Sequence, residues 1–234
     1  MTVVDLQTKA LEVHQRLLRA FGQQPHRLSH DPIAVLVSTI ISQNTNDTLR
    51  DKAFDLLRQR FPTWEQVRDA PVEDVTASIR IAGLSQQKGP CIQQALRRMW
   101  DERGELSLDF LAHMEVGEAK QWLTSIKGVG PKTAAIVLLF SLGMPAFPVD
   151  THIHRVTRRL GLIPENASRE KAHGLLESLL RPDTYHSFHL NLIRHGRQVC
   201  AARRPHCERC VLRDLCDHYR DVMRPQGGAS TEQD

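Results

Sequence analysis

Apolar residues recur every three or four positions along most of this chain, which is the spacing of an amphipathic helix. Along residues 3–21 the apolar positions are Leu6, Ala10, Val13, Leu17 and Phe21. The stretch from Ile33 to Ile41 is apolar on nearly every side, so it is predicted to be a buried, central helix. No stretch alternates as a β-strand does. The pattern therefore predicts an all-α fold.

Start and stop residues divide the chain into successive helices. Asp31 before Pro32 is a helix start, and Thr63 with Gln66 has the form of a capping box. Further helices are expected over about 47–60, from Pro71, through Trp100 to near Gly104, over 116–125, from Pro131 to about Leu142, from Asp150 to Leu160, from Ser168, and from Pro182 to Val199. The segment 219–234 ends in Gly, Ser, Gln and acidic residues, so it is predicted to be a disordered tail.

Composition is that of an ordinary globular protein with a slight basic excess. The chain has 234 residues, of which 41% are hydrophobic and 25% charged, and a formal charge of +4. This balance fits a polyanionic partner. The longest apolar run is too short to cross a bilayer. The early Asp5 and the amphipathic spacing indicate that the N-terminus is not a signal peptide.

The stretch 123–137, LTSIKGVGPKTAAIV, is the most informative in the chain. Gly128 and Gly130 permit a tight turn between two short apolar helices, and Pro131 suits the first position of the second helix. The amides at that helix start can bind a phosphate. Lys132 lies in the same turn, where a positive charge is disfavoured, and a nucleophilic lysine must be neutral. An ordinary helical hairpin with a surface lysine is the alternative.

Four of the five cysteines lie within seventeen residues of one another. Cys200, Cys207, Cys210 and Cys216 form a C-x6-C-x2-C-x5-C pattern, whereas Cys91 is isolated and is expected to be a small core residue. Four thiolates can hold a zinc ion or an iron–sulfur cluster. Zinc sites more often use two C-x2-C pairs, so the single pair favours a cluster without excluding zinc. The clustering indicates a metal site in a reducing compartment.

Asp150 follows Lys132 by 18 positions and opens a predicted helix. Taken alone, Asp150 is best explained as a helix N-cap. Taken alone, Gln43 in the polar run 42–47 is a cap or loop residue, and Leu84 is an ordinary loop leucine.

These motifs together resemble the endonuclease III branch of the helix–hairpin–helix DNA glycosylases. The resemblance rests on Gly-Val-Gly-Pro-Lys-Thr-Ala at 128–134, Val-Asp-Thr-His at 149–152 and the cysteine spacing, in that order, and it covers about residues 5–218. The polar run containing Gln43 and the Gly83-Leu84 loop also match the family in position. Two features depart from the family pattern. Ser85-Gln86-Gln87 follows Leu84, where the family often has an aromatic residue or asparagine, and the acid of the polar run, Asp47, comes one place later than in the best-known enteric members.

The resemblance implies a two-lobed helical glycosylase fold. One lobe would be a helical barrel over residues 23–144 that ends in the hairpin. The other would combine residues 1–22 with 145–218 and carry a 4Fe-4S cluster on Cys200, Cys207, Cys210 and Cys216. The protein would be a cytoplasmic, nucleoid-associated bacterial monomer with no membrane contact. Its partner would be double-stranded DNA containing a damaged pyrimidine or an abasic site.

The resemblance also implies a bifunctional DNA glycosylase and abasic-site lyase of base excision repair that removes oxidised pyrimidines. Lys132 and Asp150 would be catalytic, with Lys132 forming a Schiff base that leads to β-elimination. Leu84 would be a wedge and Gln43 would fill the space left by the flipped base. The amides of Gly128 and Gly130 would bind a phosphate.

Two alternatives remain open beside this reading. One is a mismatch-directed thymine or uracil glycosylase of the same fold, which Lys132 disfavours in its purely monofunctional form. The other is a non-catalytic DNA-binding or redox module that keeps the hairpin and the cluster. Base release from a defined duplex separates both from the main interpretation.

Overall fold

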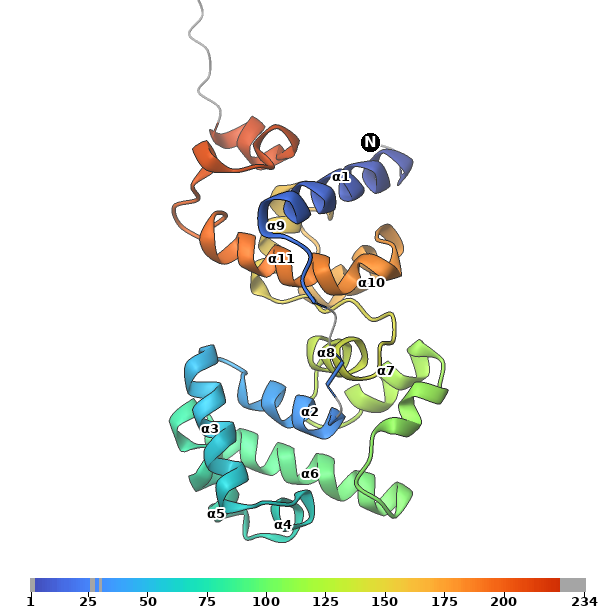
Figure 1. Ribbon diagram of the computed structural model, residues 1–234, viewed down its shortest axis with the longest axis vertical. Coiled ribbons are helices and arrows are strands. Elements are labelled where there is room, and N and C mark those ends of the chain that lie inside the picture. The colour runs from blue at the N-terminus through green and yellow to red at the C-terminus, as the bar shows by residue number, and fades with distance from the viewer. Residues whose placement is uncertain (1–2, 26–27, 30, 224–234) are drawn as a thin grey trace, which may run out of the picture. The chain divides into compact units, whose positions relative to one another are not determined.

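The structure, a computed structural model, describes residues 3–25, 28–29 and 31–223, and within these ranges it contains helices and no strand (Figure 1). The α-helices are α1 (Val3–Phe21), α2 (Pro32–Ile41), α3 (Asp47–Arg60), α4 (Trp64–Asp69), α5 (Val72–Ser78), α6 (Ser85–Arg103), α7 (Val116–Thr124), α8 (Pro131–Ser141), α9 (Thr151–Arg159), α10 (Arg169–Leu179) and α11 (Tyr185–Gln198). Short 3-10 turns are η1 (Arg80–Ala82), η2 (Asp109–His113), η3 (Pro182–Thr184), η4 (Cys207–Arg209) and η5 (Arg213–Leu215). The prediction of an all-α fold is confirmed.

The chain divides into two compact units. One is the continuous segment His26–Pro148, and the other combines Met1–Pro25 with Val149–Asp234. The sequence placed the corresponding boundaries after residues 22 and 144, a few residues earlier in each case.

The continuous unit is built around α2. Pro32 occupies the first turn of α2, and Asp31 caps it by accepting a hydrogen bond from the amide of Ala34 at 2.9 Å. Leu36, Ile40 and Ile41 are fully buried. Helix α2 packs against α8, α3 and α6, and α8 in turn packs against α7. The central position predicted for this apolar helix is confirmed.

The discontinuous unit joins the N-terminal helix to the C-terminal third of the chain. Helix α1 packs against α11 and α10, and α11 also packs against α9. Two ion pairs tie α1 to the loops that follow α11: Lys9 with Asp217 at 2.9 Å and Arg16 with Asp214 at 2.5 Å. The apolar face of α1 is therefore covered by helices from the C-terminal third of the chain.

The ends of the chain differ from the prediction. Tyr219–Met223 forms a short π-helix, so the expected disorder of 219–234 is wrong for these residues, and residues 224–234 lie outside those described. The predicted helix 182–199 is a 3-10 turn followed by α11, because Pro182 and Asp183 form a tighter turn before the α-helix begins. No helix among the described residues is long and apolar enough to span a membrane.

Candidate active site

The hairpin between α7 and α8 has the geometry predicted for it. Gly130 is the N-cap of α8 and Pro131 takes its first position, with no side chain capping the helix start. Ile126 and Val129 are buried and anchor the turn to the core. The start of α8 is therefore an uncapped helix N-terminus, the kind of site that binds phosphate.

Gly128 is required in this turn for two separate reasons. Its φ of 86° lies in the left-handed region, where a Cβ is disfavoured. A Cβ there would also lie 2.7 Å from the sulfur of Cys91. The Cys91 thiol donates to the carbonyl oxygen of Lys127 at 3.1 Å, so this cysteine holds the turn in place from α6. Cys91 is buried, as predicted, and burial raises the pKa of its thiol.

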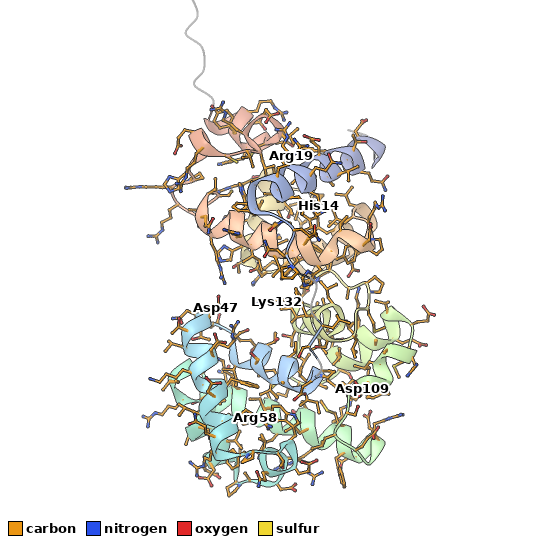
Figure 2. The ribbon with its side chains drawn as sticks, viewed as in Figure 1. His14, Arg19, Asp47, Arg58, Asp109 and Lys132 are labelled. Atoms are coloured by element: carbon orange, nitrogen blue, oxygen red, sulfur yellow. The ribbon has the colours of Figure 1, made fainter. Side chains whose placement is uncertain are left out.

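Lys132 lies in the first turn of α8 (Figure 2). It is half-buried, whereas Lys127, the lysine just before the turn, is exposed. Within the described part of the chain, the ammonium group of Lys132 has neither a carboxylate nor a hydrogen-bond partner. A lysine anchored on a rigid helix with an unoccupied amino group is suited to attack a carbon electrophile.

Gln43 and Leu84 lie on two turns of the same unit. The side-chain amide of Gln43 donates to the carbonyl oxygen of Gly128 at 3.1 Å, so the structure brings Gln43 to the hairpin turn. Leu84 is 46% exposed at the start of α6, with φ 51° and ψ 27°. Only Asn44 and Leu84, among the described residues other than glycine, have positive φ. Backbone strain of this kind is concentrated at functional sites.

Sequence reasoning passed over Lys88, four positions after Leu84. Its side chain is 2% exposed, and its ammonium group donates to the carbonyl oxygens of Ile41 and Ala82. A lysine close to a polar loop is ordinarily exposed, so the hydrophobic pattern contains no sign of this burial.

Asp150 is the N-cap of α9 and belongs to the discontinuous unit. Its carboxylate accepts a hydrogen bond from the amide of Ile153 at 2.7 Å, and its side chain is half-buried. The capping role considered from sequence is therefore present. It leaves the second carboxylate oxygen available for another role, because the cap uses only one oxygen.

The four clustered cysteines line a single pocket of the discontinuous unit. The pocket also contains His195, Leu212 and the side chain of Arg159. Burial raises the pKa of the Cys210 thiol to about 11, and burial with neighbouring cysteines raises the pKa values of Cys207 and Cys216. Thiols whose ionisation is disfavoured by burial become stable thiolates when a cationic centre binds them.

Hydrogen-bond donors lie next to two of these sulfur atoms. The guanidinium group of Arg159 donates to Cys200 Sγ at 3.2 Å, and the amide of Leu212 donates to Cys210 Sγ at 3.4 Å. Among the described residues, no three His, Cys, Asp or Glu side chains are grouped closely enough for one metal ion. A sulfur-lined pocket with hydrogen-bond donors to sulfur has the chemistry of a site for a thiolate-bound metal ion or cluster.

The comparisons with known proteins agree with this geometry. A family profile described as "HhH-GPD superfamily base excision DNA repair protein" matches residues 37–182, which include the hairpin and Asp150. The chain belongs to the HhH-GPD superfamily. Its resemblance to the endonuclease III branch is confirmed by endonuclease III of Sulfolobus acidocaldarius, which is 32% identical over 193 residues, or 82% of this chain and 84% of that protein.

Two further matches extend the HhH-GPD assignment. The putative DNA glycosylase At3g47830 of Arabidopsis thaliana is 37% identical over 71% of this chain, and the match spans 56% of that longer protein. The solved structure of a trapped endonuclease III–DNA covalent intermediate covers 96% of this chain and 100% of its own, with a TM-score of 0.77 and 27% identity. This HhH-GPD protein therefore has the fold of base excision repair glycosylases.

Proposed function

We propose that this HhH-GPD protein is a bifunctional DNA glycosylase and abasic-site lyase that removes oxidised pyrimidines from duplex DNA. The observation that carries the proposal is Lys132, which lies half-buried in the first turn of the hairpin's second helix and has no partner among the described residues. The structurally similar endonuclease III has been trapped as a covalent intermediate with DNA, which is the chemistry that a nucleophilic amine performs.

The proposed reaction begins when the neutral amine of Lys132 attacks C1′ of the damaged nucleotide. The C1′–N bond breaks, the base leaves with the electron pair and takes up a proton, and the amine loses its proton. Asp150 stabilises the positive charge that develops on the sugar. The sugar ring then opens to a Schiff base, and loss of a C2′ proton expels the 3′ phosphate by β-elimination. Water releases the lysine at the end.

The target base must leave the helical stack before Lys132 can reach its sugar. We assign the wedge to Leu84, whose exposed apolar side chain stands on a strained turn. We assign Gln43 to the space left by the flipped base. The amides at Gly128 and Gly130 hold a backbone phosphate without reading sequence. The protein acts as a monomer in this proposal.

The cysteine pocket is proposed to hold a 4Fe-4S cluster on Cys200, Cys207, Cys210 and Cys216. Such a cluster supplies a redox-capable, covalently linked centre for this loop when bound. Arg159 donates to one of the four sulfur atoms and lowers the cost of its negative charge. The zinc alternative predicts zinc and no sulfide in the purified protein, whereas the cluster predicts iron and sulfide in equal amounts.

The test is borohydride trapping on a duplex that contains one oxidised pyrimidine. Lys132→Ala removes the proposed nucleophile, and Lys127→Ala is the matched control because it removes the exposed lysine on the other side of the turn. We expect a covalent adduct with the parent and with Lys127→Ala, and none with Lys132→Ala. An adduct that survives Lys132→Ala overturns the assignment of the nucleophile.

Two further measurements separate the alternative functions. Base release from a G·T mismatch but not from an oxidised pyrimidine would identify a mismatch glycosylase instead. Salt-dependent duplex binding without base release or adduct, from protein with its cluster in place, would identify a non-catalytic binding module.

A further inference from the structure

Lys88 is a buried cation whose ammonium group is held by two backbone carbonyl groups. It lies one turn into α6, where its amide donates to the carbonyl oxygen of Leu84 at 3.1 Å. Its side chain folds back toward the helix start, as helical side chains do. The ammonium group donates to the carbonyl oxygens of Ile41 at 2.8 Å and Ala82 at 2.9 Å. Within the described ranges, no carboxylate pairs with it.

Such an arrangement is energetically demanding, and burial lowers the pKa of the Lys88 ammonium group. One compensation is the position of the Ile41 oxygen at the C-terminal end of α2, where the helix dipole favours a cation. The other is that Lys88 supplies hydrogen bonds to two carbonyl groups that would otherwise be unpaired in an apolar interior. A methionine of similar length would fill the same space without supplying either hydrogen bond.

The two carbonyl groups belong to different turns, and each turn carries a residue assigned to DNA. Ile41 precedes Gln43 by two positions, and Ala82 precedes Leu84 by two positions. Both contacts come from one nitrogen atom, so the two turns are fixed at a single distance from each other. Cys91, one helical turn further along α6, holds the hairpin turn through the Lys127 carbonyl group.

We propose that Lys88 is a positioning residue that locks the Gln43 turn to the Leu84 turn, so that both side chains enter the duplex together. This inference rests on the proposed function. Insertion of only one of the two residues leaves either the wedge or the filler missing, and the base falls back into the stack. Excision of an intact damaged base therefore depends on Lys88 more than cleavage at an existing abasic site, where no base has to be extruded.

The variants are Lys88→Met and a matched control, Gln93→Met. Gln93 is also 2% exposed and lies on the same helix. Its side-chain amide donates to the carbonyl oxygens of Val67 at 2.9 Å and Ala70 at 2.7 Å, which lie away from both DNA turns. The same nitrogen also donates to the carbonyl oxygen of Arg68 at the longer distance of 3.4 Å. Each substitution therefore removes one buried nitrogen that donates to two backbone carbonyls at short distance, and both variants should lose comparable thermal stability.

Two activities are measured in single turnover: release of an oxidised pyrimidine, and cleavage of a preformed abasic site. A third readout needs no catalysis. It is the fluorescence of 2-aminopurine placed opposite a tetrahydrofuran abasic analogue, which rises when the opposite base is unstacked.

For Lys88→Met we expect base release to fall by about tenfold or more, abasic-site cleavage to change less than about threefold, and the 2-aminopurine rise to be lost. Gln93→Met should keep all three signals. Equal loss of both activities in Lys88→Met, or the same pattern in Gln93→Met, overturns the positioning role. If the parent releases no base, the proposed function fails, and the fluorescence comparison alone then decides whether Lys88 couples the turns.

Discussion

The strongest constraint on the hairpin is the absence of a side chain at Gly128, and Gly128→Ala tests it. Alanine would have to adopt the left-handed backbone conformation at this position, which costs about 1–2 kcal/mol. Its Cβ would also lie 2.7 Å from Cys91 Sγ, well inside van der Waals contact. Forcing an extra methyl group into a packed site adds about 1–3 kcal/mol. The expected loss in the free energy of unfolding is therefore about 2–5 kcal/mol.

A double-mutant cycle with Cys91→Ala separates the two contributions. Without the sulfur, the nearest atom to the new Cβ is Cys91 Cβ at 3.4 Å, an ordinary contact. In that background Gly128→Ala should cost only the backbone strain, about 1–2 kcal/mol. The coupling energy between the two sites should then be about 1–3 kcal/mol.

Urea denaturation of the four proteins gives this coupling, provided that fluorescence and circular dichroism report coincident transitions. A control is Gly117→Ala, because a Cβ at Gly117 meets no atom within 4 Å and its φ is not positive. Equal costs of Gly128→Ala in the presence and absence of the sulfur would refute the steric argument. A cost no greater than that of Gly117→Ala would refute the backbone argument as well.

Three further predictions address the other turns and the discontinuous unit. Leu84→Asn should leave the free energy of unfolding unchanged or raise it by about 0.5–1 kcal/mol, because asparagine tolerates positive φ. Base release should fall in this variant, and a loss of stability in chemical denaturation would contradict the argument from φ. Asp150→Asn keeps the N-cap of α9 and should cost less than about 0.5 kcal/mol, whereas Asp150→Ala should cost about 1 kcal/mol. Base release should be lost in both Asp150 variants, and an active Asp150→Asn would reduce this residue to a cap. Burial of His14 on α1 (Figure 2) lowers its pKa below 6.5, and the nearby carboxylate of Asp183 offsets part of this shift. As pH falls below 6.5, the unfolded chain therefore binds a proton that the folded chain does not, and the free energy of unfolding decreases. His14→Gln should make that fall shallower in denaturation curves measured from pH 7 to pH 5, and identical slopes would rule out His14 as a source.

Local chemistry explains which features could be predicted from sequence. Asp31 and Thr63 cap α2 and α4 as expected, because a cap needs only residues within one turn of each other. The shared pocket of the four cysteines follows from their closeness in the chain. The hairpin was predictable for the same reason, since its glycines and proline are consecutive.

Contacts between distant segments explain what could not be predicted. Lys88 reaches a carbonyl group 47 positions away, Cys91 reaches one 36 positions away, and Gln43 reaches one 85 positions away. No local sequence pattern predicts which carbonyl group each of these side chains contacts. The left-handed conformation of Leu84 was equally invisible, because propensity would place glycine or asparagine there.

The ion pairs between α1 and the C-terminal loops have a consequence for synthesis on the ribosome. Lys9 and Asp217 are 208 positions apart, so α1 waits for nearly the whole chain before its partners exist. At about 5–20 residues per second this delay is roughly 10–40 s. The segment His26–Pro148 is continuous and can fold as it emerges. The apolar face of α1 stays uncovered until α10 and α11 have been synthesised, so this helix is among the last elements of the fold to gain its packing partners.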